Sequence, residues 1–389
     1  MSEERWHYLQ ISDALDEEFT AALSRVVPVM AWRPSMSGWA MLSGNHAGEI
    51  AERTGEPGLT VWSFPLQRGY ARAPVSWLAG NGRGLTARLL RHAPRPAETP
   101  LVCSTPYHAP VAERWPGPVV YYLTDLIAAY AGVDPKQVKS LDRRMCAAAR
   151  LACPNSTRLA EYLVRDAGCA PTKITVLPNA TRATNLVASP LLAPERLPAD
   201  ADDLQRPVAG VIGNMGANID WSLLREMVRG APEISWLMVG PVGDDVPDET
   251  ERAARQELLG MGGRVRFVGK KPYGELAGYA RSVDVAVLPY KLREPTYSGS
   301  STRFYEHLAA TRPILATRGF EELLHKPPLL RLIDTAEEGV QALREMENSG
   351  FNDGQIEARW AASRDGTWEK RAAAMYRALG EAGSSVRHS

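Results

Sequence analysis

A run of small hydroxylic residues, followed by an arginine and a glutamate, is the part of this sequence best suited to chemistry. The stretch TYSGSSTRFYEHLAATRPILAT covers residues 296–317, and its helical pattern begins close to Arg303 and Glu306. The first N–H groups of a helix have no partner within the helix and attract anions. Hydroxyl donors and a guanidinium strengthen such a site through charge-assisted, bidentate contacts. The stretch therefore predicts an anion site beside a carboxylate that accepts hydrogen bonds from hydroxyl groups.

A purely structural interpretation of the same pair stays open at this point. Arg303 and Glu306 are three residues apart, so a helix places them on one face. A surface ion pair of this kind contributes only about 0.3 kcal/mol and requires no ligand. We favour the anion site because of the sequence context that follows.

The stretch belongs to a chain in which apolar runs alternate with amphipathic segments. Apolar runs bounded by prolines and polar residues are typical of strands that are buried on both faces of a parallel sheet. Strands are expected at residues 6–12, 100–106, 118–125, 173–179, 208–214, 234–241, 264–269, 284–290 and 313–317. Helices are expected at residues 16–27, 139–156 (running into a short strand), 156–168, 220–232, 248–260, 273–282 and 368–379.

This alternation predicts an α/β fold with two doubly wound parallel-sheet domains. A length of 389 residues also exceeds one ordinary hydrophobic core. The stretch 183–206 is rich in proline and acids, and we interpret it as a linker. The expected domains are residues 1–182 and 207–360, and residues 361–389 are expected to form a helical segment that returns to the first domain.

Ligands of doubly wound sheets bind outside the carboxyl ends of the strands. In the second domain these ends carry GNMGAN, GPVGDD and GKKP, whose glycines allow the backbone to approach a ligand closely. The candidate ligand-binding residues at these ends are Gly213, Asn214, Gly240, Pro241, Val268, Gly269 and Tyr290.

The motifs taken together resemble a known family. The second half contains GVIGNMGANIDWSLL, WLMVGPV, RVRFVGKKPYGELAGYARSVDVAVLPY and SSTRFYEHLAATRPILAT, and the first half contains PVVYYLTD, LACPNSTRLAEYL and KITVLPNAT. From about residue 100 to its end, the chain resembles the retaining glycosyltransferases of the B-type, two-Rossmann fold in the large family-four group. The nearest branch is the one that assembles polysaccharides such as teichuronic acid and xanthan. Residues 1–99 resemble the family weakly.

This resemblance implies a GT-B architecture, in which two Rossmann-like domains face a cleft. The amino-terminal domain would hold a glycan, lipid-linked or small-molecule acceptor, and the carboxyl-terminal domain a nucleoside-diphosphate sugar. Glu306 would bind the ribose hydroxyls and Arg303 a phosphate. The further donor-binding residues that the resemblance implies are Ser298, Gly299, Ser300, Ser301 and Thr302.

Two departures from the family pattern concern this donor site. The family often has a second glutamate eight residues before the first, and here that position is Ser298. It also often has an arginine and a lysine after the first glycine loop, whereas no basic residue follows Gly213 up to Asn218. Arg303 is therefore expected to carry more of the phosphate neutralisation.

Two residues of the first domain join Arg303 as catalytic candidates. Asp125 ends a buried strand, so it either contacts or deprotonates the acceptor or caps the next helix. His108 follows the strand that ends at Pro106, and it either reaches a sugar hydroxyl or has a structural role in its loop.

No metal and no cofactor is expected. The acids of Asp200–Asp202 lie in the predicted linker rather than after a strand, so we interpret them as solvated. A helix terminus and Arg303 would neutralise the leaving diphosphate instead. Since the sequence offers no well-placed nucleophile, the resemblance implies retention by front-face attack, with the leaving phosphate taking the acceptor proton.

The composition argues against several partners and locations. Lys and Arg number 45 and Asp and Glu number 45, so no net charge attracts nucleic acid. The first residues carry acids rather than a signal sequence, and no apolar run approaches the roughly 20 residues of a membrane helix. Cys103, Cys146, Cys153 and Cys169 lack metal-ligand spacing and are expected to be free thiols in a reducing cytoplasm.

A basic segment between residues 68 and 95 leaves a membrane contact open. It contains arginines and no acid, with Trp77, Leu78, Leu85, Leu89 and Leu90 interleaved. Such a surface docks on anionic lipid at the inner face of a membrane, binds an anionic acceptor, or is a solvated loop.

The sequence therefore predicts a retaining, metal-independent glycosyltransferase of the cytoplasm. Two alternatives remain. One is a nucleotide-sugar epimerase of the same fold, which would act without an acceptor. The other is a degenerate relative that binds nucleotide without catalysis, because the first glutamate is absent at Ser298.

Overall fold

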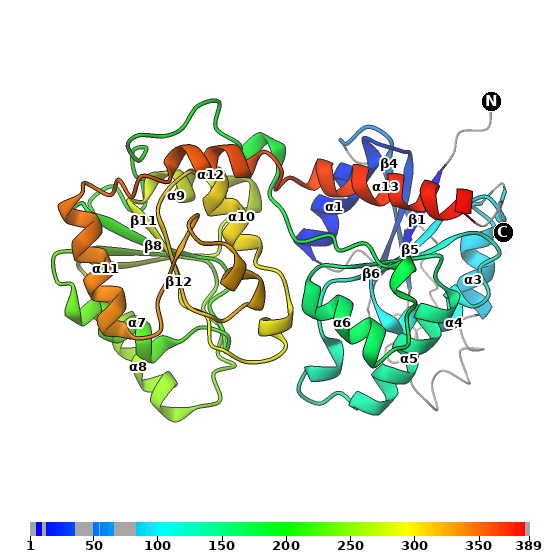
Figure 1. Cartoon of the computed structure of the whole chain (residues 1–389), viewed down its shortest axis with the longest axis horizontal. Coiled ribbons are helices and arrows are strands. Elements are labelled where there is room, and N and C mark those ends of the chain that lie inside the picture. Colours follow the sequence, from blue (N-terminus) through cyan, green and yellow to red (C-terminus); the bar gives the residue numbers. More distant parts are fainter. Residues whose placement is uncertain are drawn as a thin grey trace. The chain divides into compact units, whose positions relative to one another are not determined.

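The computed structural model describes residues 5–9, 13–35, 50–53, 55–65, 83–93 and 95–385 (Figure 1). The chain divides into two compact units. The first comprises Met1–Pro178 together with Trp368–Ser389, and the second comprises Asn179–Thr367. Each unit has its own sheet, flanked by helices.

The first unit contains a seven-stranded sheet with the order β3-β4-β2-β1-β5-β6-β7. Its strands run parallel, except that β3 is antiparallel to β4. Their bounds are β1 (Trp6–Leu9), β2 (Val29–Ser35), β3 (Ile50–Arg53), β4 (Leu59–Pro65), β5 (Leu101–Cys103), β6 (Val119–Leu123) and β7 (Leu151–Pro154). As the apolar runs predict, β5, β6 and β7 are buried along their whole length.

The helices of the first unit begin at residues that satisfy free backbone groups. The Ser156 hydroxyl, for example, accepts from the Leu159 N–H at the start of α6. The α-helices are α1 (Ala14–Ser24), α3 (Arg83–Leu90), α4 (Ala109–Ala112), α5 (Pro135–Ala148), α6 (Thr157–Arg165) and α13 (Trp368–Ser385). Short 3₁₀ turns are η2 (Pro106–His108), η3 (Ile127–Ala129) and η4 (Pro171–Lys173).

Helix α13 belongs to the first unit although it ends the described chain. It lies against α1 (Figure 1), and its Trp368 ring meets the Phe19 ring edge-on at 6.2 Å between centroids. Farther along, Tyr376 stacks on Trp6 at 5.7 Å. These aromatic contacts, together with the Arg25–Glu369 ion pair at 2.7 Å, attach the end of the chain to its beginning.

The second unit contains a six-stranded, fully parallel sheet with the order β10-β9-β8-β11-β12-β13. The bounds are β8 (Val208–Ile212), β9 (Ser235–Val239), β10 (Val265–Gly269), β11 (Val285–Leu288), β12 (Ile314–Ala316) and β13 (Arg331–Leu332). This is the strand order of the Rossmann fold, in which the first three strands extend the sheet to one side and the next three extend it to the other. The topological switch point therefore lies between β8 and β11.

The helices of the second unit cover both faces of this sheet. The α-helices are α7 (Trp221–Gly230), α8 (Glu249–Met261), α9 (Leu276–Ser282), α10 (Thr302–Ala309), α11 (Ala336–Asn348) and α12 (Ile356–Ser363). The 3₁₀ turns are η5 (Ala183–Asn185), η6 (Tyr273–Glu275), η7 (Thr296–Ser298) and η8 (Glu321–His325).

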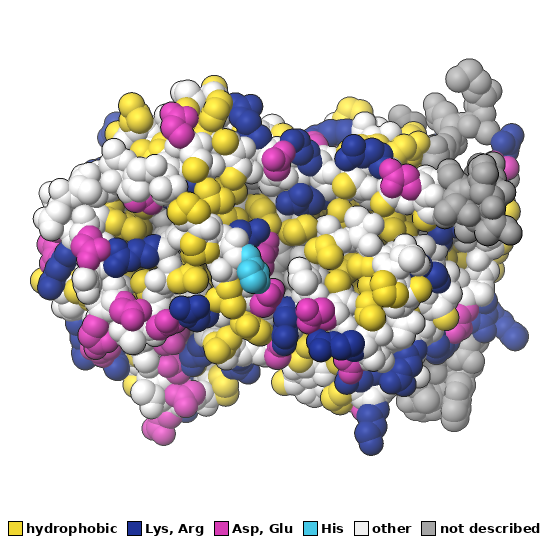
Figure 2. Space-filling view, in the orientation of Figure 1, with side chains coloured by type: hydrophobic (Ala, Val, Ile, Leu, Met, Phe, Trp, Pro, Cys, Tyr) yellow, Lys and Arg dark blue, Asp and Glu magenta, His cyan; other side chains and the backbone are white. Residues whose placement is uncertain are grey.

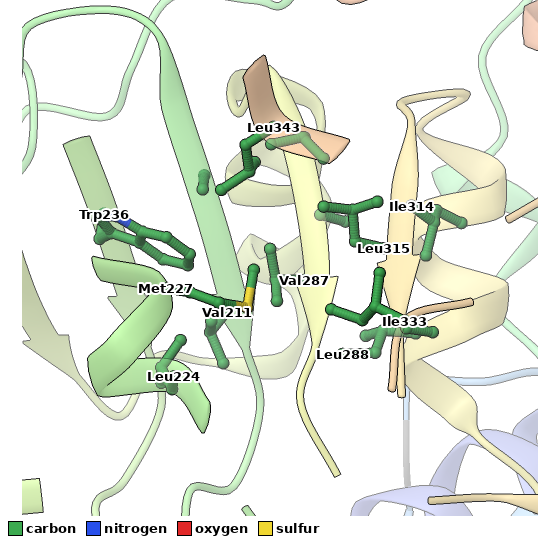
Figure 3. Packing of buried hydrophobic residues seen from close by; sticks show 14 of the residues in the cluster. Val211, Leu224, Met227, Trp236, Val287, Leu288, Ile314, Leu315, Ile333 and Leu343 are labelled. Atoms are coloured by element: carbon green, nitrogen blue, oxygen red, sulfur yellow. The ribbon is translucent and has the colours of Figure 1, made fainter. Parts of the chain in front are cut away.

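Alternate strand residues of the second unit supply two cores. Trp236 joins Met227 of α7 and Leu343 of α11 in one cluster (Figure 3), whereas Leu237 faces a second cluster that includes Leu276 of α9. A strand that is buried on both faces reads as a continuous apolar run, as the sequence does here. The predicted fold class, α/β with two doubly wound parallel sheets, is therefore confirmed.

The structure corrects the interpretation of residues 183–206 as a linker. Leu197, Ala201 and Leu204 of this stretch are buried in the second core cluster. Asp200 accepts from the Tyr279 hydroxyl at 2.8 Å and pairs with Lys271 at 2.5 Å. The segment is irregular and packs into the second unit. The sequence did not predict this packing, because the apolar residues of the segment follow neither a helical nor a strand period.

Other local predictions also differ from the structure. Residues 173–179 form no strand; Ile174 makes only an isolated bridge to Ala152. Strands β2 and β4 and helices α11 and α12 were not predicted. All four cysteines are free thiols, as predicted, and the structure buries all four.

Candidate functional site

The carboxyl ends of β8 and β9 approach each other through two glycines. The Gly213 N–H donates to the Val239 carbonyl at 2.7 Å, and the Gly240 N–H donates to the Gly269 carbonyl at 2.9 Å. Gly213 has φ +133° and Gly240 has φ +138°, a region that other residues rarely adopt. A Cβ on Gly240 would collide with the Gly213 carbonyl oxygen. Only glycine therefore permits this tight edge at the switch point.

The Arg303 guanidinium lies directly on Gly213. A Cβ at that glycine would collide with Nε of Arg303 and would lie 3.0 Å from its Cζ. Arg303 is in the first turn of α10, whereas Gly213 follows β8. The two meet because β8 and β11, the strand before α10, are neighbours in the sheet. This contact brings two predicted site residues together at the topological switch point.

Arg303 and Glu306 form a mostly buried ion pair. Nη1 of Arg303 lies 2.5 Å from Oε2 of Glu306, and the two side chains are 21% and 5% exposed. Burial alone would lower the pKa of Arg303, but the Glu306 carboxylate and the Tyr290 phenol hold it above its usual value. Oε1 of Glu306 has no hydrogen-bond partner among the residues that the structure describes. The pair is thus not the exposed surface pair considered from the sequence, and it leaves one carboxylate oxygen available.

Helix α10 points its amino end at the same place. Ser301 caps it by accepting from the Phe304 N–H at 3.3 Å. Within the described ranges, the N–H groups of Thr302 and Arg303 have no hydrogen-bond acceptor. Free N–H groups at a helix start, next to a guanidinium, are the arrangement that the predicted anion site requires.

The hydroxyl groups that the sequence analysis assigns to an anion site form hydrogen bonds within the protein. Ser300 accepts from the Asn179 N–H at 2.9 Å and donates to Glu322 at 2.7 Å. Thr302 accepts from the Asn179 side chain at 2.9 Å. With Ser301 serving as the cap, these hydroxyls fix the loop, and the backbone and Arg303 remain to meet a ligand. Sequence reasoning missed Asn179 and Glu322, because each lies far along the chain from the loop that it holds.

A carboxylate that was not predicted lies next to Ser298. The Glu294 carboxylate accepts from the Ser298 hydroxyl at 2.8 Å and from its N–H at 3.2 Å. Ser298 itself is 4% exposed, and a Cβ on the neighbouring Gly299 would lie 3.6 Å from the Phe320 ring. The loop thus carries a carboxylate four residues before the position where the family pattern has one.

The remaining predicted positions surround this edge. Asn214 and Pro241 are exposed residues that follow the two tight glycines. Val268 packs against the second core cluster, and Gly269 has φ +70° at the end of β10. Tyr290 follows β11 and is 7% exposed.

Asp125 follows β6 in the first unit and does not cap a helix. The next turn, η3, has Leu126 at its cap position and no side-chain cap. Burial raises the pKa of Asp125 to about 6, while a hydrogen bond from Tyr130 opposes the rise and the nearby Asp13 and Asp16 add to it. Of the roles considered from the sequence, the capping role is excluded, and a half-buried carboxylate at a strand end remains.

His108 lies in the interior of the first unit. It is 0% exposed, and burial lowers its pKa to about 3. A neutral, fully covered ring offers no surface to a substrate hydroxyl, so the structure favours the structural interpretation of this residue. The η2 turn directs it inward, a detail that strand-end reasoning does not capture.

The basic segment 68–95 is described only from residue 83 onward, apart from residue 94, and Arg68, Arg72, Trp77 and Leu78 lie outside the described residues. Leu85 and Leu89 of α3 face the core, with 9% and 0% exposure, and so are not available to a membrane. Helix α3 contacts α4, which packs against α5, and Figure 2 shows Lys and Arg side chains gathered around α5.

The residues that the structure describes contain neither a metal-binding cluster nor a membrane-spanning helix. Within that part of the chain, no group of three or more His, Cys, Asp or Glu side chains is arranged to hold a metal ion. None of the helices described there has both the length and the apolar character needed to cross a bilayer.

The architecture matches solved structures of the GT-B fold, among them a glycosyltransferase and a UDP-forming synthase. HepE of Anabaena, solved with UDP and glucose, has a TM-score of 0.65 and 15% identity, and the match covers 97% of this chain and 99% of HepE. A glycosyltransferase of Rickettsia africae ESF-5 has a TM-score of 0.70 and 10% identity over 98% and 99% of the two chains. A UDP-forming α,α-trehalose-phosphate synthase of Burkholderia vietnamiensis has a TM-score of 0.65 and 14% identity over 98% and 100%. The chain therefore has the GT-B fold.

Sequence comparison gives one short match and no family profile. The chain is 28% identical over 111 residues to TuaH of Bacillus subtilis strain 168, described as a putative teichuronic acid biosynthesis glycosyltransferase. The match covers 28% of this chain and 26% of TuaH. No protein-family profile matches the chain.

Proposed function

We propose that this protein is a glycosyltransferase that moves a sugar from a nucleoside diphosphate to a hydroxyl acceptor. The observation that carries the proposal is the Arg303 guanidinium, which lies on Gly213 at the switch point, at the amino end of α10 and paired with Glu306. A cation and free N–H groups suit a diphosphate, and a carboxylate oxygen suits a ribose hydroxyl. The GT-B fold and the short match to TuaH support the same reading.

The proposed roles follow from charge. Arg303 and the first N–H groups of α10 bind the diphosphate and stabilise the charge that grows on it as the glycosidic bond breaks. Glu306 uses one oxygen to hold Arg303 and the other to accept from the ribose. Gly213, Asn214, Gly240, Pro241, Val268, Gly269 and the loop 298–302 complete the donor site.

On the acceptor side we assign a role to Asp125. It accepts a hydrogen bond from the attacking hydroxyl, which requires the ionised form. We propose that the anomeric configuration is retained, with the leaving phosphate taking the proton. If Asp125 instead removes the proton during attack from the opposite face, the configuration inverts. Nuclear magnetic resonance of the first product formed distinguishes the two, because it reports the anomeric coupling.

A panel of UDP-, GDP- and dTDP-sugars tests the proposal. We expect one of them, with a hydroxyl acceptor, to give glycoside and free nucleoside diphosphate, and we expect the rate to persist in EDTA because Arg303 and α10 supply the positive charge. Formation of an epimer without acceptor would identify an epimerase. Nucleotide binding without any turnover would favour the degenerate alternative. Complete loss in EDTA, restored by Mg²⁺ or Mn²⁺, would overturn the metal-free mechanism.

We further propose a cytoplasmic enzyme that contacts the inner face of a membrane through the arginines of α3 and the residues after it. Replacing Arg83, Arg88 and Arg91 together by serine is expected to weaken binding to anionic vesicles at low salt, because each basic residue contributes about 1 kcal/mol at such a surface. Co-sedimentation with phosphatidylserine vesicles measures this. Equal sedimentation of the variant and the wild type would remove the membrane contact.

A further inference from the structure

Asn179 is a buried residue that reaches the start of α10 from a distant part of the chain. It is 6% exposed, begins the second unit and lies 121 positions before Ser300. Its N–H donates to the Ser300 hydroxyl at 2.9 Å. Its Nδ2 donates to the Ser300 carbonyl at 2.8 Å and to the Thr302 hydroxyl at 2.9 Å. These three hydrogen bonds fix the Asn179 amide against the first residue of α10.

The direction of the hydrogen bond between Asn179 and Thr302 follows from the groups involved. A carbonyl oxygen can only accept, so the Asn179 amide must turn its NH₂ group toward the Ser300 carbonyl. The other hydrogen of the same NH₂ group is then the one that meets the Thr302 oxygen. The Thr302 hydroxyl is therefore the acceptor in this contact, and it keeps its own proton for another partner.

Thr302 differs in this respect from the two serines before it. Ser300 donates its proton to Glu322 at 2.7 Å and is 6% exposed, and Ser301 is 1% exposed. Thr302 is only partly buried, and within the described part of the chain no acceptor takes its hydroxyl proton. Thr302 thus offers its hydroxyl proton as well as its backbone N–H, next to Arg303 at the beginning of α10.

Such a pair of donors beside a guanidinium suits an oxyanion. A hydrogen bond to a charged acceptor is stronger than one between neutral groups, and a hydroxyl that already accepts one hydrogen bond becomes a better donor. A freely rotating hydroxyl also turns its lone pairs toward the ligand part of the time, which repels an anion. Asn179 disfavours that orientation, because its NH₂ group faces the Thr302 oxygen.

We propose that Asn179 is a positioning residue for the diphosphate of the nucleotide sugar. It orients the Thr302 hydroxyl so that the proton points to a phosphate oxygen, and it contacts no ligand itself. This inference rests on the proposed function, since it concerns the same site.

Binding of nucleoside diphosphates to the full chain, measured by calorimetry, tests this role. UDP, GDP and ADP are compared on the wild type, and the tightest binder is then used with the variants. Thr302→Val should weaken binding by roughly 10-fold, because a hydrogen bond to a charged group is lost. Thr302→Ser should keep most of the affinity, since the hydroxyl remains.

Variants at Asn179 should weaken the same ligand without removing any group that touches it. Asn179→Ala is expected to lower the affinity by roughly 5-fold, because the Thr302 hydroxyl is no longer oriented. Asn179→Asp should lower it further, because a carboxylate accepts the Thr302 proton and repels the phosphate.

A double variant shows whether Asn179 acts through Thr302. Adding Asn179→Ala to Thr302→Val should change the affinity by less than about 2-fold, because the group that Asn179 orients is already absent. Asn185→Ala is the matched control, since the Asn185 amide donates to the Thr181 hydroxyl at 2.9 Å in the same unit. It should keep the wild-type affinity.

The other outcomes separate the inference from the proposed function. If Asn179→Ala and Asn179→Asp lower Tm but keep the wild-type affinity in the folded protein, Asn179 is purely structural and the inference is wrong. Fully additive losses in the double variant, or an unchanged affinity in Thr302→Val, would also overturn it. If the wild type binds none of the three diphosphates, the proposed function itself fails.

Discussion

Replacing Arg303 by alanine is expected to lower kcat by roughly 10²–10³-fold, the scale on which one preorganised donor acts on developing charge. The contact should strengthen as negative charge grows on the diphosphate, so the loss falls on kcat more than on KM. Arg303→Lys should recover part of the rate, because the charge returns without the bidentate geometry. Steady-state kinetics on variants whose folding is checked by circular dichroism measures both.

The structure supplies two further variants that separate charge from position. Gly213→Ala keeps Arg303 but puts a Cβ where its guanidinium lies, at a φ of +133°. It should therefore lower kcat in the same direction as Arg303→Ala. Glu306→Gln should mainly raise the donor KM, by an amount corresponding to roughly 1.5–3 kcal/mol, because the ribose does not react.

A structural role for the pair predicts a different pattern. Removing Arg303 leaves the Glu306 carboxylate, whose side chain is 5% exposed, without its partner, which lowers thermal stability in any case. If the Arg303–Glu306 pair only stabilised the fold, Arg303→Lys and Gly213→Ala would have a lower Tm but near-normal kcat and KM in the folded fraction. That result would remove the donor-site assignment of residues 298–306.

The second large effect is expected at Asp125. Asp125→Asn should lower kcat/KM by roughly 10²-fold, the scale on which a slight misplacement of a reacting group lowers the rate. The wild-type rate should fall as the pH drops through about 6, because the hydroxyl needs the ionised carboxylate and burial has raised its pKa to that value. In Asp125→Asn this fall in rate at low pH, the acid limb of the pH profile, should disappear, since the amide does not titrate.

The pH dependence of the rate separates a catalytic from a structural role of Asp125, because a purely structural role would not make the rate fall near pH 6. Asp166→Asn is a suitable control, because Asp166 is an aspartate of the same unit that pairs with Lys139 at 2.7 Å on the surface. It should keep both the rate and the acid limb. An Asp125→Asn variant with a normal rate, or one that retains the limb near pH 6, would exclude Asp125 from the reaction.

The sequence by itself determined many of the elements and the residue types that the candidate site carries. Continuous apolar runs predicted β6, β8 and β9, because strands covered on both faces have no polar side to alternate with. The i,i+3 spacing placed Arg303 and Glu306 on one face of α10, and local geometry suffices for that. Asp125 was likewise predicted at a strand end.

Tertiary structure alone decided which of these residues meet. Gly213 and Arg303 are 90 positions apart, and they touch only because β8 pairs with β11 in the sheet. The engagement of Ser300 by Asn179 and Glu322, the burial of His108 and the packing of residues 183–206 likewise depend on distant partners. Hydrophobic periodicity indicates which side of an element is buried but not which other element covers it, because the hydrophobic effect has no directional preference. Which neighbour covers each element is fixed by strand order and side-chain packing, which bring together parts of the chain that no local pattern connects.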